Sequence, residues 1–70
     1  MTRAERMVLR QLDIQNPSHI SDFYRLGNEK EIATALVTLD MNDTIAAMHG
    51  KQYRLVNELT EAESSAIWTN

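Results

Sequence analysis

The stretch DTIAAMHGKQYRLV, residues 43–56, decides the fold that this sequence predicts. Residues 44–48 and 52–56 are compatible with β-strands, and the link 49–51 between them contains a glycine. Two such runs joined by a short glycine-containing link are typical of a β-hairpin. We therefore expect a two-stranded hairpin near the C-terminal end of the chain.

The side chains of the second strand alternate between two faces, because successive side chains of a strand point in opposite directions. Tyr53 and Leu55 share one face, whereas Gln52, Arg54 and Val56 share the other. Removing large apolar and aromatic side chains from water lowers the free energy of the folded state. Tyr53 and Leu55 are thus expected to face a core, and the other face is expected to meet solvent.

A first helix is predicted at the N-terminal end of the chain. Thr2 followed by Glu5 is the signature of a capping box, and Pro17 disfavours helical geometry in the residue before it. This helix should therefore end between residues 13 and 16. Its apolar residues recur at helical spacing: Val8, Leu9 and Leu12.

Two more helices are predicted between Pro17 and the hairpin, separated by a tight turn. Ser18 is the expected N-cap of the second helix and Gly27 its terminator, and Asn28 is the expected N-cap of the third, which should end around residues 41–43. The apolar stripes are Ile20, Phe23 and Leu26 in the second helix and Ile32, Leu36 and Leu39 in the third.

The order of these elements resembles a winged helix-turn-helix DNA-binding domain of the small bacterial or phage regulator type. The resemblance covers roughly residues 4–56 and is carried by four pieces: VLRQL in the first helix, ISDFYRLG in the second, IATALVTLD in the third and TIAAMHGKQYRLV at the position of the wing. It implies an α+β fold, mostly α, with three helices and a two-stranded wing in residues 1–57. One departure is Asn42-Asp43 where many members have glycine, but both residues tolerate turn geometry.

The same resemblance implies a sequence-specific transcriptional regulator. Helix 29–41 would enter the major groove of DNA, while the second helix and the 44–56 wing would hold the phosphate backbone. The expected DNA-binding residues are Lys30, Thr34, Val37 and Thr38 on the third helix, Ser21, Tyr24 and Arg25 on the second, and His49, Lys51, Gln52 and Arg54 on the hairpin.

The charge distribution leaves a second function open. Residues 1–56 hold seven basic and seven acidic residues, so the net charge of −3 belongs to the three glutamates after residue 56. Because residues 1–56 have no net positive charge, they produce no overall positive electrostatic potential that would attract a nucleic acid. The alternative is a winged-helix module that binds another protein instead of DNA, through Val37 and Met41 or through the apolar tail.

The C-terminal extension, residues 58–70, is acidic and has an N-cap pattern of Thr60 with Glu63. It is predicted to form a short fourth helix or a partly ordered extension. A single small DNA-binding module has little contact area, so a homodimer is expected through the apolar edge of this segment: Leu59, Ala62, Ala66 and Trp68.

A stripe of arginines on the first helix, Arg3, Arg6 and Arg10, has three open interpretations. It lies beside a phosphate path, it meets an acidic partner, or it is a solvated helix face, which is the usual role of such a stripe. Two other residues also have alternatives. His49 is either a turn residue or a phosphate ligand, and Trp68 either covers a core or dimer seam or is free.

Several function classes are not expected for this sequence. It has no cysteine and only two histidines, which leaves no thiolate chemistry and few metal ligands. No nucleophile, base and orienting group occur together, so we expect neither an enzyme nor a cofactor. No apolar run approaches the roughly 18 residues of a membrane span. The expectation is a soluble, cytoplasmic protein with no membrane partner.

Overall fold

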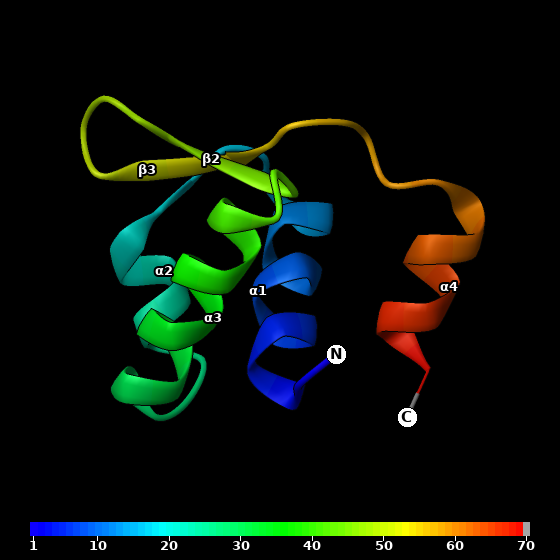
Figure 1. Cartoon of the computed structure of the whole chain (residues 1–70), viewed down its shortest axis with the longest axis horizontal. Helices are drawn as coiled ribbons and strands as arrows, with labels where there is room; N and C mark the ends of the chain where they lie inside the picture. The colour runs from blue at the N-terminus through cyan, green and yellow to red at the C-terminus, as the bar shows by residue number, and fades with distance from the viewer. Residues whose placement is uncertain (70) are drawn as a thin grey trace.

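A computed structural model describes residues 1–69 of the chain. Its strands form a single antiparallel sheet with the spatial order β1-β3-β2, and helices precede and follow the hairpin of β2 and β3 (Figure 1). The described part is therefore a mostly helical α+β fold, as the sequence predicts, with four helices and with three strands where two were expected. The elements are α1 (Arg3–Ile14), β1 (Ser18–His19), α2 (Ile20–Tyr24), α3 (Glu29–Met41), β2 (Ile45–Met48), β3 (Gln52–Leu55) and α4 (Glu61–Trp68).

The helix starts are set by side chains that bind free backbone N–H groups. Thr2 and Glu5 form the predicted capping box of α1, Asn28 caps α3 through the N–H of Glu31, and Thr60 begins α4. The predicted end of α1 before Pro17 and the predicted fourth helix are both confirmed.

The predicted start of the second helix is wrong. Ser18 is not the N-cap of α2, because it lies one residue earlier in β1 and is fully buried. Its hydroxyl donates to the carbonyl of Gln15 at 2.5 Å and accepts from Nε2 of Gln11 at 3.1 Å. His19 takes the capping role instead, since its Nδ1 accepts the N–H of Ser21 at 3.1 Å. The end differs too: α2 finishes at Tyr24, before Gly27.

Strand β1 was not predicted, and it fixes the hairpin to the helices. Ser18 pairs with Tyr53 and His19 pairs with Gln52, so β3 is the central strand of the sheet. The side-chain amide oxygen of Asn16 also accepts the N–H of Leu55 at 3.1 Å. The hairpin is therefore anchored along its length by the segment that joins α1 to α2.

The hairpin itself matches the prediction to within one residue at each end. Its link contains Gly50 with φ 75° and Lys51 with φ 55°, both in the left-handed region that favours glycine. Asp43 also has a positive φ, 57°, at the turn between α3 and β2. Aspartate tolerates this conformation, so the turn forms without the glycine that the resemblance would place there.

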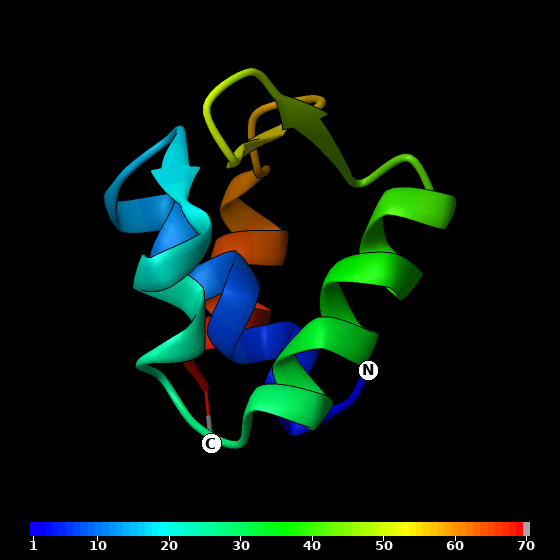
Figure 2. The same cartoon turned by 90° about the vertical axis from the view of Figure 1, so that its left-hand side faces the viewer.

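The core lies between α1, α3 and the inner face of the sheet, which covers one end of the helices (Figures 1 and 2). Leu55 is buried and Tyr53 is half-buried, with its ring edge-on to Phe23 at 6.1 Å between centroids. The predicted facing of β3 is therefore confirmed. Each large apolar side chain in this core contributes about 2 kcal/mol by leaving water.

Helix α4 packs against α1, on the side away from α2 and α3 (Figure 1). Ile67 enters the core, and Asp13 accepts hydrogen bonds from Ser64 at 3.0 Å and from Nε1 of Trp68 at 2.7 Å. Arg10 donates to the carbonyl of Ile67 and stacks on the ring of Trp68. One of the three arginines on α1 therefore holds the C-terminal end of α4, where a positive charge suits the helix dipole.

Candidate nucleic-acid interface

The outward face of α3 carries the residues that the sequence predicts for base contacts. Ile32, Leu36 and Leu39 are buried, so the opposite side of the helix is turned away from the core. Lys30, Thr34 and Val37 are exposed there, whereas Thr38 is half-buried on a flank. Two apolar side chains stand out on this face: Val37 is 58% exposed and Met41 is 78% exposed.

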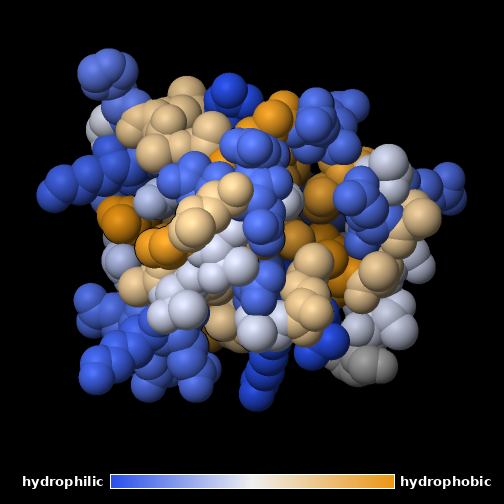
Figure 3. Space-filling model, viewed as in Figure 1, coloured by the Kyte–Doolittle hydropathy of each residue, from blue (hydrophilic) through white to orange (hydrophobic). Residues whose placement is uncertain are grey.

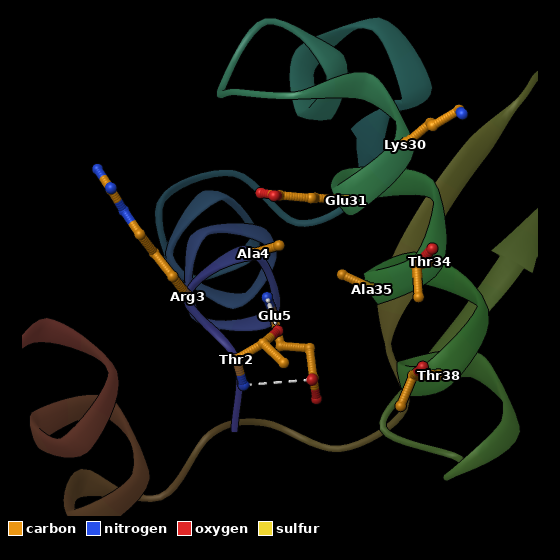
Figure 4. Close-up of a pocket in the computed structure, with 9 residues that line it drawn as sticks. All are labelled: Thr2, Arg3, Ala4, Glu5, Lys30, Glu31, Thr34, Ala35 and Thr38. Carbon is orange, nitrogen blue, oxygen red and sulfur yellow. Dashed lines mark hydrogen bonds between the residues drawn. The ribbon is translucent and has the colours of Figure 1, made fainter.

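A groove of about 530 Å³ runs along one flank of α3, between this helix and the start of α1 (Figure 4). Ala4 and Ala35 face each other and form its floor, while Lys30 and Arg3 point away from it. Glu31 directs its carboxylate from α3 toward α1. The lining residues are Thr2, Arg3, Ala4, Glu5, Lys30, Glu31, Thr34, Ala35 and Thr38.

Thr34 and Thr38, two of the predicted site residues, lie beside carboxylates in this groove. Thr34 and Thr38 share its wall with the carboxylates of Glu5 and Glu31. Like charges repel, so two carboxylates disfavour a phosphate at this flank. This flank of α3 is therefore not suited to binding phosphate.

The predicted site residues on and beside α2 already make contacts within the protein. Arg25 forms an ion pair with Asp22 at 2.9 Å, and Tyr24 is half-buried against the core. The hydroxyl of Ser21 lies 3.0 Å from Nδ1 of His19. Ser21 and Arg25 remain exposed, so they keep hydrogen-bonding capacity toward a partner.

The hairpin turn lies next to the start of α2. The backbone N–H of Ile20 donates to the carbonyl of Lys51 at 2.8 Å, and His19 pairs with Gln52 across the sheet. His49 and Lys51 are exposed at this turn. The structure thus brings the start of α2, where Ser21 lies, next to the turn of the hairpin, although these segments are far apart in the sequence.

Arg54 lies on the outer face of β3, two residue pairs farther from the turn than Gln52. It is exposed, and its guanidinium donates to the carbonyl of Leu55 at 3.1 Å. Gln52 is half-buried on the same face, opposite Met48. The predicted residues of the hairpin therefore form a row on the outer face, with Lys51 and His49 at its end.

Charge around α3 and the hairpin is mixed. Lys30, Lys51 and Arg54 are exposed cations, and Glu29, Glu31, Asp40 and Asp43 are exposed carboxylates on or beside α3. The face that carries α3 shows hydrophobic side chains between hydrophilic ones (Figure 3). The positive charge available to a polyanion is therefore local, at the hairpin and at the start of α3.

Two features of the site had no signal in the sequence. His19 was not predicted to cap α2 or to lie beside Gln52, because a histidine N-cap is unusual and β1 is only two residues long.

Within residues 1–69, no group of three or more His, Cys, Asp or Glu side chains is placed to hold a metal ion. In the same range, no helix is both long and apolar enough to cross a membrane.

Comparison with protein-family models, with curated protein sequences and with solved structures finds no match to this chain.

Proposed function

We propose that this chain is a winged helix-turn-helix domain that binds double-stranded DNA as a small sequence-specific transcriptional regulator. In this proposal α3 lies in the major groove and the hairpin is the wing, which contacts the phosphate backbone. The proposal rests on the element order that resembles this family and on the position of the hairpin.

The observation that carries the proposal is the hydrogen bond from Ile20 to Lys51, together with the pairing of β1 and β3. These bonds hold the hairpin turn against the start of α2. A DNA-binding wing must keep a fixed distance from the neighbouring elements that contact the backbone, here the start of α2, because phosphates lie at fixed intervals along the duplex. An anchored hairpin meets that requirement, whereas a free one would lose entropy on binding.

Each residue then has a defined task. Lys51 and His49 bind phosphates next to the hydroxyl of Ser21, and Arg54 extends this contact along β3. Thr34 reads base edges, and Val37 packs on a thymine methyl group, since hydroxyls accept and donate to several bases and apolar side chains recognise that methyl. Lys30 contacts guanine or a phosphate at the start of α3.

The test is the salt dependence of binding to duplex DNA, followed by fluorescence anisotropy. Replacing Lys51 with alanine removes one phosphate contact, so the slope of log K against log salt should fall by about one unit. Ala62→Glu is the matched control, because it lowers the net charge by the same amount on the exposed side of α4. An unchanged slope in Lys51→Ala, or an equal change in the control, would reject the wing assignment.

A second function is favoured by the side chains of Val37 and Met41, which are 58% and 78% exposed on the same face of α3. Together with the carboxylates beside α3, they suit a protein partner with an apolar groove and a basic rim. In that case Val37→Asp would abolish capture of the partner, and the protein would show no salt-sensitive binding to DNA.

A further inference from the structure

A second apolar surface lies on α1, and no residue of α3 takes part in it. A hollow of about 230 Å³ is bordered there by two exposed side chains, Ile14 at 73% and Trp68 at 47%. Exposed apolar residues that cluster around a hollow usually mark a contact with another macromolecule. The residues that line the hollow are Met7, Arg10, Gln11, Ile14, Leu26 and Trp68.

Trp68 is held by two contacts although it is 47% exposed. Its Nε1 donates to the carboxylate of Asp13 at 2.7 Å, and the guanidinium of Arg10 lies 5.5 Å from the centre of its ring. A side chain that is fixed before binding loses little entropy when a partner covers it. Tryptophans of this kind, placed beside a pocket, are typical centres of protein interfaces.

Basic and acidic side chains lie at opposite ends of this surface, along the direction of α1. Asp13, near the end of α1, contacts Ser64 in the middle of α4, and the two helices run in opposite directions (Figure 1). Arg3 lines a neighbouring hollow that shares Met7 and Leu26 with the first and also includes Glu31. Within the described part of the chain, Arg3 and Glu31 form no ion pair, so the exposed guanidinium of Arg3 is the positive charge at this end. The acidic end is the start of α4, where the exposed glutamates are Glu58, Glu61 and Glu63.

These two ends are not joined within one copy of the chain. In residues 1–69, the only ion pair within 4.0 Å is Arg25 with Asp22. The arginines at the start of α1 and the glutamates at the start of α4 therefore lack partners of opposite charge in the described part of the molecule. A surface with a basic end and an acidic end is complementary to itself when turned by 180°.

We propose that this surface is the interface of a two-fold symmetric homodimer. The Ile14 side chain of each copy fills the hollow beside Trp68 of the other, and the two α1 helices cross in antiparallel fashion. Arg3 of one copy then lies opposite Glu61 of the second copy. A protruding side chain beside a hollow on the same surface is what an isologous contact requires.

This interface differs from the edge that the sequence predicts. Leu59 was expected in the seam, but it is half-buried and packs against the core. Trp68 is the only member of the predicted edge that borders the hollow. The contact is therefore made chiefly by α1, with Trp68 contributed by α4.

The first test is sedimentation of the full chain over a range of concentrations, without DNA. Ile14→Asp places a charge in the interface and should raise the dimer dissociation constant by about tenfold or more, while Val37→Asp, an exposed apolar position on α3, should leave it unchanged. Circular dichroism verifies that both variants are folded. A wild-type chain that stays monomeric up to about 1 mM, or a dimer that is insensitive to Ile14→Asp, would overturn the proposal.

The second test is a charge exchange that checks the antiparallel arrangement. Arg3→Glu and Glu61→Arg should each weaken the dimer, and the two changes together should restore it, because the pair is then reversed rather than lost. Lys30→Glu serves as the control on α3. Failure of the double variant to recover would contradict the antiparallel crossing. Because DNA is absent from both tests, their outcome is independent of the proposed DNA binding.

Discussion

The backbone N–H of Ile20 lies 2.8 Å from the backbone carbonyl of Lys51, and this contact joins the first residue of α2 to the turn of the hairpin. Lys51 itself has a left-handed backbone, which turns its carbonyl toward α2 while its side chain stays exposed. The position of the proposed wing thus depends on backbone geometry at residues 50 and 51.

Gly50 should be sensitive to the addition of a single methyl group. Its φ is 75°, and a Cβ atom at this position would meet nothing within 4 Å. The cost of Gly50→Ala is therefore conformational, and we expect a loss of about 1 kcal/mol in the free energy of unfolding, measured with urea. Gly27→Ala is the control: its φ is not in the left-handed region, and its Cβ would make an ordinary contact at 3.6 Å. An equal loss in both variants would contradict this account.

Ser18 should be more important for stability than its size suggests. It is 1% exposed and uses its hydroxyl both as donor to Gln15 and as acceptor from Gln11. Ser18→Ala leaves these groups unsatisfied, which should lower the free energy of unfolding by about 1–3 kcal/mol. The exposed Ser65 on α4 is a suitable comparison, and Ser65→Ala should change stability by less than about 0.5 kcal/mol. Similar unfolding midpoints for the two variants would count against the anchoring role of Ser18.

Asp13 should control the docking of α4. Its carboxylate accepts from both Ser64 and Trp68, so Asp13→Ala should free the indole and shift its fluorescence emission to longer wavelength. Trp68 is the only tryptophan, so the signal reports on α4 alone. Asp40→Ala is a matched control, because Asp40 is also the penultimate residue of its helix and has the same relation to the helix dipole. Emission that is unchanged by Asp13→Ala would reject this contact.

The start of α4 should respond to acid. The N–H of Thr60, and then its hydroxyl, form hydrogen bonds with Glu63 that lower the pKa of this carboxyl from its ordinary value of 4.5. A lowered pKa stabilises the folded state above the ordinary value, and this contribution is lost as the pH falls through the lowered pKa. Trp68 emission should therefore show a transition below pH 4.5, reduced in Glu63→Gln and retained in Glu58→Gln. A transition of equal size in Glu63→Gln would show that other groups cause it.

Sequence preference should depend on α3 rather than on the hairpin. Thr34 is exposed on the outward face of this helix, so Thr34→Ala should change the relative affinity for different duplexes, with about 1 kcal/mol or more of discrimination lost at one base pair. Lys51→Ala should instead weaken all duplexes equally, because phosphates carry no sequence information. Selection from a random pool measures both effects. Uniform weakening by Thr34→Ala would contradict insertion of α3 in the groove.

The sequence predicted elements whose signals are local. The capping pairs Thr2 with Glu5 and Thr60 with Glu63 act over three residues, and the alternation of Tyr53 and Leu55 is a property of one strand. These patterns arise from helix and strand geometry alone. Local geometry therefore made α1, α3, α4 and the hairpin predictable.

Features that depend on distant partners were not predictable. β1 has two residues and no strand pattern of its own, and it exists because Ser18 and His19 pair with β3. The contact of Arg10 with Trp68 joins residues that are 58 positions apart and has no periodic signal. The ion pair of Arg25 with Asp22 is local, but it depends on side-chain rotamers that the sequence pattern does not specify. Tertiary contacts thus decide which of the predicted site residues remain free.

The most direct measurement of the central proposal is a titration of the full chain against random-sequence duplex DNA at two salt concentrations. If α3 and the hairpin bind DNA, affinity should fall steeply between low and physiological salt, with a slope of about 0.9 for each neutralised phosphate. The exposed cations Lys30, Lys51 and Arg54 predict a total slope of roughly three. Binding that is undetectable at low salt, or that does not change with salt, would contradict the account.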